Sequence, residues 1–305
     1  IEKEKGVIVE ELRMIKDNPA QYIGSLYEGL QFGDQPLGWD IGGEEKIIQT
    51  FKREDFIQYV NSLYSPQNIV LVFAGKLPKD IQRLAEKYFL ELPQRGKFIV
   101  EPYKKTKQSK TKVKIYYKKT DQANIVLGVE GYSRYDEKRY AASVLGIILG
   151  EGMSSRLFLQ VRERRGLAYH ISAGPGYYLD TGTFTAYAGL KIEKVHEGLE
   201  VIKAELEQVV TEKVTDDELK KAKEMARGRL AIRAESTNFL AEYFGTNFVL
   251  DRKIETFEEL LEKIDAVTKE DIQKVAGELF EKEKFNLQII GPFKDADKFK
   301  AILNK

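Results

Sequence analysis

Two segments of the chain repeat one another at a constant spacing of 216 residues, and this repeat constrains the fold more than any other feature of the sequence. Leu71 corresponds to Leu287 and Gly75 to Gly291, with no gap between the pairs. Each copy has the pattern of an amphipathic helix that opens at a polar turn and is followed by a strand ending at the glycine. Two unrelated helix–strand units could match by chance, but the register is kept over the whole stretch. The pattern therefore favours a duplicated unit.

The repeat also predicts how the chain is divided. Residues 97–111 break the periodicity with Pro102 and a run of lysines, which is typical of a linker. The second unit then covers residues 112–305. Applying the same spacing, the first unit would start well ahead of Ile1, and the chain opens in a helical pattern without an initiator methionine. We therefore expect residues 1–96 to be the back half of a truncated N-terminal domain.

The second unit predicts an α+β fold. Alternating or continuous apolar runs indicate strands, and longer amphipathic runs indicate helices. Strands that come in runs with helices beside them favour a sandwich in which helices cover one face of a mostly antiparallel sheet. We thus expect duplicated α/β sandwich units, the first truncated. The expected strands are 69–75, 113–117, 125–129, 169–177, 182–190 and 285–291, and the expected helices of the second unit are 139–149, 154–164, 195–210 and 216–235.

Composition excludes several classes of function. The 49 basic and 48 acidic side chains leave a net charge of +1, so no overall field attracts nucleic acid or an anionic membrane. Eight lysines lie within residues 104–119, but a solvated linker and an edge strand guarded by lysine explain them better than nucleic-acid binding does. No apolar run approaches the roughly 20 residues of a membrane span. With no cysteine and only two histidines, the chain cannot build a zinc site from several histidines.

The first helical pattern, residues 1–17, carries an unusual pair of carboxylates. Its apolar positions form one stripe, and Glu4 and Glu11, seven residues apart, project from the middle of that stripe. A carboxylate on a buried face is costly unless it is paired, protonated or bound to a metal. Two interpretations follow: the pair meets buried arginines or lysines, or Glu11 is a metal ligand that Glu4 supports.

A second candidate site joins the end of a helix to the start of a strand. Arg162 lies in the last turn of the helix expected over 154–164, and Tyr169 opens the next strand after a break at Gly166. This hinge could bring a guanidinium and a phenol together, a combination suited to binding carbonyl oxygens or a developing oxyanion. The alternative is an ordinary solvated basic helix end.

These motifs resemble those of the pitrilysin and mitochondrial-processing-peptidase family, the zinc peptidases with an inverted H-x-x-E-H motif. The resemblance spans nearly the whole chain, and the motifs recur in the order of the family. The matching segments are 4–12 followed by Asp17-Asn18-Pro19, 64–70 followed by Ala74-Gly75, 152–157, the Arg162…Tyr169 pair and 267–271.

The resemblance implies roles for four residues. Glu11 matches the third zinc ligand and Glu4 the glutamate that supports it, while Arg162 and Tyr169 match the pair from the second domain that holds the substrate backbone. The H-x-x-E-H motif itself is absent from this sequence. The complete protein is therefore expected to be a zinc-dependent endopeptidase that binds Zn²⁺ and acts on peptides or unfolded polypeptides, and this chain alone is expected to be inactive. The sequence that follows Pro36-Leu37-Gly38 also differs from the family's usual form.

The family allows a second class of function. Some members have lost the zinc motif and serve as non-catalytic structural or substrate-binding subunits of a heterodimeric processing peptidase. Retention of both Glu4 and Glu11 argues against that class here. The expected partners are a missing N-terminal portion, a peptide substrate, and a second subunit in a homodimer or heterodimer. We expect a cytoplasmic location, with a periplasmic one left open.

Overall fold

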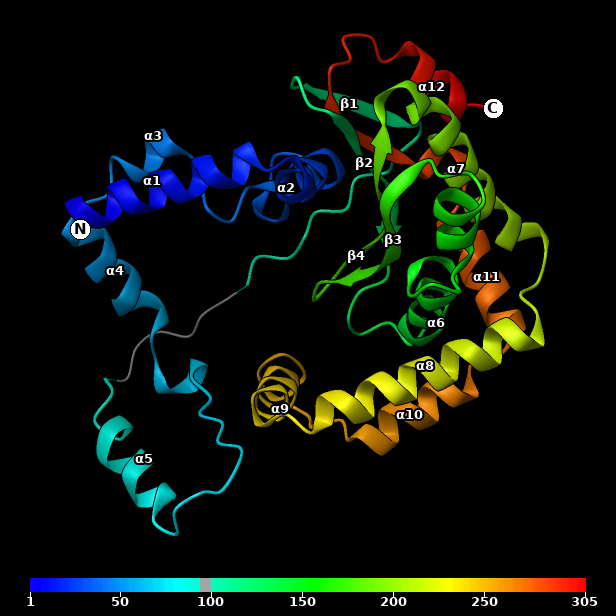
Figure 1. Cartoon of the computed structure of the whole chain (residues 1–305). Coiled ribbons are helices and arrows are strands. Elements are labelled where there is room, and N and C mark those ends of the chain that lie inside the picture. The colour runs from blue at the N-terminus through cyan, green and yellow to red at the C-terminus, as the bar shows by residue number, and fades with distance from the viewer. Residues whose placement is uncertain (94–99) are drawn as a thin grey trace.

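A five-stranded sheet, seen in Figure 1, carries the main core of the computed structural model, which describes residues 1–93 and 100–305. The strand order is β1-β5-β2-β4-β3; β1 pairs with β5 in parallel, and the other pairs are antiparallel. The expected mostly antiparallel sheet is therefore confirmed. Its strands are β1 (Lys112–Tyr117), β2 (Gln122–Gly131), β3 (Ala168–Tyr177), β4 (Gly182–Lys191) and β5 (Asn286–Gly291).

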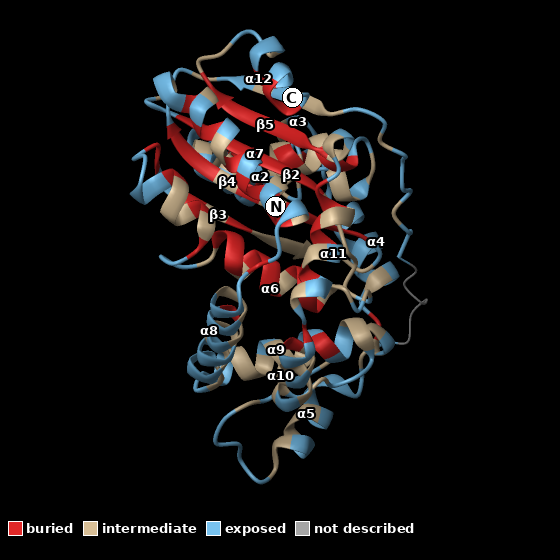
Figure 2. Ribbon diagram, turned by 90° about the vertical axis from the view of Figure 1, so that its right-hand side faces the viewer, coloured by how far each residue is buried: buried red, intermediate tan, exposed pale blue. Residues whose placement is uncertain are grey.

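Helices cover one face of this sheet because alternate strand residues are apolar. Ile125, Leu127 and Val129 of β2 are fully buried against that helical layer. Figure 2 shows the buried residues gathered in the sheet and in the helices against it. A Cβ at Gly150 would overlap the backbone of Ala173, so glycine permits the close approach of α6 to β3. The helices that contribute to the layer are α6 (Arg139–Gly150), α7 (Val195–Thr211), α11 (Lys269–Leu279) and α12 (Asp297–Leu303).

Three further helices extend from this layer and follow one another in the chain. Two of them begin at a capping box, in which a threonine accepts the backbone N–H of a glutamate three residues later: Thr215 with Glu218 and Thr256 with Glu259. The same device opens α11 at Thr268, where the sequence predicts a polar turn. The three helices are α8 (Asp216–Ala234), α9 (Thr237–Asp251) and α10 (Phe257–Ala266).

The N-terminal 93 residues are mostly helical, and one helix joins them to the sheet. Helix α2 lies on the face of the sheet opposite the helical layer, where Ile23 and Tyr27 pack on Val126 and Ile290. Figure 1 shows α1 extending away from the sheet and α5 standing apart from it. The elements of this part are α1 (Glu2–Asp17), α2 (Pro19–Phe32), η1 (Pro36–Gly38), α3 (Glu45–Ile48), α4 (Arg53–Leu63), η2 (Pro66–Asn68) and α5 (Ile81–Phe89).

The strand expected over residues 69–75 is not formed, which corrects that prediction. Its repeat counterpart β5 lies between β1 and β2, but in the described residues no strand flanks 69–75. Leu71 is 40% exposed, whereas Leu287 in the second copy is 0% exposed. A lone strand cannot pair its own N–H and C=O groups, so the segment forms no ladder.

None of the described helices is both long enough and apolar enough to cross a membrane.

Candidate functional site

Arg162 and Tyr169 lie together on the surface. The helix expected over 154–164 forms over residues 156–163, and its larger part, η3 (Phe158–Glu163), is π-helical rather than α-helical. The guanidinium carbon of Arg162 lies 4.9 Å from the centre of the Phe158 ring and 5.4 Å from that of Tyr169. Both distances fall within cation–π range, so the two rings hold the guanidinium in one place. The structure thus brings the predicted pair together.

The local backbone explains why Tyr169 faces outward. Gly166 has φ +59° and reverses the chain after η3, and Leu167 N–H then donates to the Val161 carbonyl at 2.9 Å. The register of β3 with β4 shifts between Ala168 and His170, which makes Tyr169 the extra residue of a bulge. Its side chain is 77% exposed. The phenol is therefore available to a ligand.

The segment before η3 is fixed to α8 by a bidentate ion pair. Arg156 donates to both carboxylate oxygens of Glu218 at 2.7 and 3.0 Å. Burial alone would raise the pKa of Glu218, but the hydrogen bonds from Arg156 and Thr215 outweigh it and lower that pKa. Phe158, four residues before Arg162, was not anticipated from the sequence, although an aromatic residue at that helical spacing was the available signal.

Glu4 and Glu11 are exposed on α1, so the expectation that they project into a buried face is wrong. The buried line of the helix runs instead through Val9 and Leu12, which pack against Ile48 of α3. The apolar stripe read from the sequence is wider than the face that is covered. The uncovered part of the stripe, which includes both glutamates at its middle, is open to solvent.

Neither glutamate has a basic partner within residues 1–93 and 100–305. The buried cation of this helix, Lys5, bonds instead to Glu2 at 2.7 Å and to the carbonyl of Gln49 at 3.2 Å. The interpretation of Glu4 and Glu11 as a pair meeting buried cations is therefore wrong, and the two carboxylates are unengaged within the described residues.

The described residues alone do not fit a zinc site. No group of three or more metal-binding side chains gathers anywhere among them. His170 lies against the ring of Tyr187 with centroids 5.6 Å apart, and His196 stacks on Phe299 at 4.6 Å. Because structural and catalytic zinc sites need at least three protein ligands, Glu11 could supply only one of them.

The helix with the two glutamates is anchored at the end of the sheet that carries Tyr169. Lys118, just after β1, donates to the carbonyl of Lys16 at 2.8 Å, at the C-terminus of α1. At the same end of the sheet, Ala168 of β3 pairs with Leu190, which pairs with Ala123 of β2. At this end of the sheet, Lys118 therefore fixes the C-terminus of α1 beside the edge strand β1. Tyr169 lies at the same end, in the opposite edge strand, β3.

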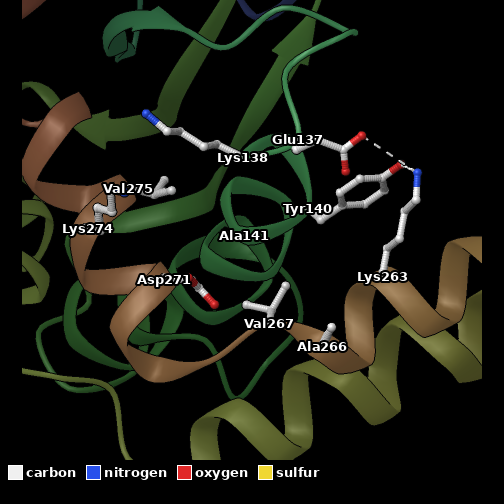
Figure 3. Close-up of a pocket in the computed structure, with 10 residues that line it drawn as sticks. All are labelled: Glu137, Lys138, Tyr140, Ala141, Lys263, Ala266, Val267, Asp271, Lys274 and Val275. Atoms are coloured by element: carbon white, nitrogen blue, oxygen red, sulfur yellow. Dashed lines mark hydrogen bonds and ion pairs between the residues drawn. The ribbon is translucent and has the colours of Figure 1, made fainter.

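A pocket of about 320 Å³ opens between α6, α10 and α11 (Figure 3), and several of its charged side chains are already paired. The Tyr140 hydroxyl accepts from Lys263 at 2.8 Å and donates to Glu255 at 2.7 Å. The bond to Tyr140 raises the pKa of Lys263 despite partial burial. Lys138 at the far side pairs with Glu278 at 2.7 Å. These contacts tie the helices together.

Comparison with known proteins identifies the family. The family model described as "Peptidase M16 inactive domain" matches residues 50–226. A protein of Streptomyces coelicolor named an uncharacterized zinc protease is 31% identical over 97% of this chain and 65% of its own length. A protein of Bacillus subtilis with the same description is 32% identical over 96% of this chain and 70% of its own length.

Solved structures agree with the fold. The crystal structure of a peptidase M16 inactive domain from Pseudomonas fluorescens has a TM-score of 0.85 and 20% identity, and it covers 96% of this chain and 70% of that one. The present chain spans 65% of the length of the Streptomyces relative and 70% of the Bacillus relative. The motif resemblance read from the sequence is thus confirmed, and the chain belongs to the peptidase M16, or pitrilysin-like, family.

Proposed function

We propose that this chain forms part of a zinc-dependent endopeptidase and supplies its substrate-orienting pair and one metal ligand. The observation that carries the proposal is the stacked, exposed arrangement of Arg162 and Tyr169. A preorganised guanidinium beside a solvent-facing phenol is suited to a peptide carbonyl that becomes an oxyanion. The names of the relatives, zinc proteases, support the same class of activity.

Each member of the pair has a distinct task. Arg162 offers several N–H donors in a fixed plane, and stacking on Phe158 limits its freedom before a peptide arrives. Tyr169 offers one O–H donor. The phenol is assigned to the carbonyl oxygen on which charge develops, so it favours the transition state over the bound substrate, whereas Arg162 grips substrate carbonyls in both states.

Glu11 is the proposed metal ligand and Glu4 its supporting carboxylate. Both are open to solvent and lack a basic partner among the described residues, so neither is committed elsewhere. Two histidines from an H-x-x-E-H segment would complete the ligand set. The bound zinc would supply Lewis-acid activation of water and of the carbonyl.

A non-catalytic subunit of a heterodimeric processing peptidase is the second candidate. It is favoured by the absence of any group of three or more metal-binding side chains in the described part of the chain. A non-catalytic role does not explain why α1 carries two glutamates that have no basic partner among the described residues. We also propose a second, related subunit as partner and a cytoplasmic location for either function.

The experiment compares zinc content in two forms of the protein. The 305-residue chain is expected to bind no zinc tightly and to show no chelator-sensitive peptide hydrolysis, because one carboxylate cannot form the site. A form that carries an H-x-x-E-H segment ahead of Ile1 is expected to bind zinc and cleave peptides. In that form Glu11→Gln should lower zinc affinity and activity together, about 10-fold or more, while circular dichroism shows the fold intact.

Glu10→Gln is the matched control, since Glu10 lies on the same helix and pairs with Arg13 at 2.8 Å on the surface. It should leave both zinc content and activity unchanged. Full zinc content in the Glu11→Gln variant would assign Glu11 to the surface and remove the metal-ligand part of the proposal.

A further inference from the structure

A larger pocket, of about 450 Å³, lies where three separate segments meet: the turn after α2, residues 100–104, and the hairpin between β3 and β4. Trp39, Tyr103 and Tyr178 contribute aromatic rings to its lining. The rings of Tyr103 and Tyr178 each lie 5.4 Å from the buried ring of Phe32 in an edge-on arrangement. Phe32 therefore supports two of the aromatic rings that line this pocket, which we call the junction pocket.

The rim of the junction pocket is acidic. The charged residues of its lining, here called the rim, are three carboxylates, from Asp34, Glu101 and Asp180, and one ammonium, from Lys104. Asp34 accepts the indole N–H of Trp39 at 2.8 Å and Asp180 the backbone N–H of Tyr103 at 2.6 Å, each through a single oxygen. The second oxygen of each aspartate, and Glu101, have no hydrogen bond or ion pair within the described residues. The rim thus offers negative charge that the chain itself does not neutralise.

We propose that the junction pocket binds the side chain of an arginine in a peptide. An arginine has an apolar stem that suits an aromatic-lined pocket, and a planar guanidinium that stacks on rings while it donates to carboxylates. Charge complementarity selects this cation over neutral or acidic side chains. That the peptide is a substrate rests on the proposed function; the binding of arginine does not.

The chain contains a convenient reporter. Trp39 is its only tryptophan, it lines the junction pocket and it is 57% exposed. Its fluorescence can be followed while the 305-residue chain is titrated with acetyl-Ala-Arg-Ala-amide, and separately with the same peptide bearing citrulline, which has nearly the same shape without the charge. A saturable change is expected with arginine, and about tenfold weaker binding or worse with citrulline.

Two variants locate the site. Asp34→Asn and Asp180→Asn each keep an acceptor oxygen for the existing hydrogen bond but remove one negative charge from the rim. Each should weaken the arginine peptide by roughly two- to fivefold, read from the dissociation constant rather than from the amplitude. Asp121→Asn is the matched control: it makes the same charge change at an exposed position outside the junction pocket and should bind as the wild type does.

Equal binding of the arginine and citrulline peptides, an unchanged dissociation constant in both rim variants, or no change in Trp39 emission would each overturn the proposal. The titration needs neither zinc nor cleavage. If Glu11→Gln abolishes zinc binding but the rim variants bind the arginine peptide as the wild type does, only the proposal for the junction pocket fails. If the rim variants bind the arginine peptide more weakly but Glu11→Gln keeps its zinc, only the proposal for the metal ligand fails.

Discussion

At the residue scale, the orienting role of Tyr169 and Arg162 leads to different kinetic effects. In the form with an H-x-x-E-H segment, Tyr169→Phe should lower kcat by roughly 10²–10³ because it removes one donor that acts on the developing oxyanion. Arg162→Ala should raise KM more than it lowers kcat, since a guanidinium that grips ground-state carbonyls contributes uniform binding. Steady-state kinetics on a quenched peptide, with zinc content measured in parallel, test both.

Tyr117→Phe is the control for the hydroxyl, because Tyr117 is also exposed but lies in β1, at the opposite edge of the sheet. It should cleave at the wild-type rate. A non-catalytic subunit would show neither kinetic effect in any variant. Wild-type kinetics in both Tyr169→Phe and Arg162→Ala would remove the orienting role.

At the element scale, the sequence predicted what depends on local pattern and missed what depends on neighbours. Strands β1 to β5 have regular or continuous apolar patterns and were predictable to within a few residues. The face of α1 was misjudged because several apolar positions, such as Met14 at 64% exposure, are left uncovered. A π-helical turn depends on a shifted hydrogen-bond register that residue types do not specify. The approach of Arg162 to Tyr169 was predictable only because Gly166 marks a reversal.

That reversal can be tested with two glycines. A Cβ added at Gly166 or at Gly228 would meet open space, but only Gly166 has φ in the left-handed region, at +59°. Gly166→Ala should destabilise the fold by about 1–2 kcal/mol, whereas Gly228→Ala, inside α8, should stabilise it by roughly 0.5–1 kcal/mol. Urea denaturation measures both. Stabilisation by Gly166→Ala would show that the backbone there is not left-handed.

At the scale of the whole molecule, the two copies of the repeat differ in how far they are buried. Phe56 and Phe73 are 49% and 46% exposed, while their counterparts Ile272 and Ile289 are 1% and 0% exposed. The second copy of the repeat therefore lies in a complete core, whereas the first copy, residues 53–75, lies in an open half-core whose apolar side chains are partly exposed. Because apolar burial is the main stabilising contribution, local stability should follow the same division.

Hydrogen exchange of the 305-residue chain tests this difference directly. Amides of α11 and β5 should be protected to near the global limit, while those of α4 and residues 69–75 should exchange on the order of 10³-fold faster. The comparison is internally matched, because the paired segments share their pattern and differ in burial. Adding a segment that supplies strands on both sides of 69–75 should slow exchange there without changing β5. Equal protection of the two copies in the chain alone would mean that residues 53–75 form a core of their own, and the inference of an open half-core would then fail.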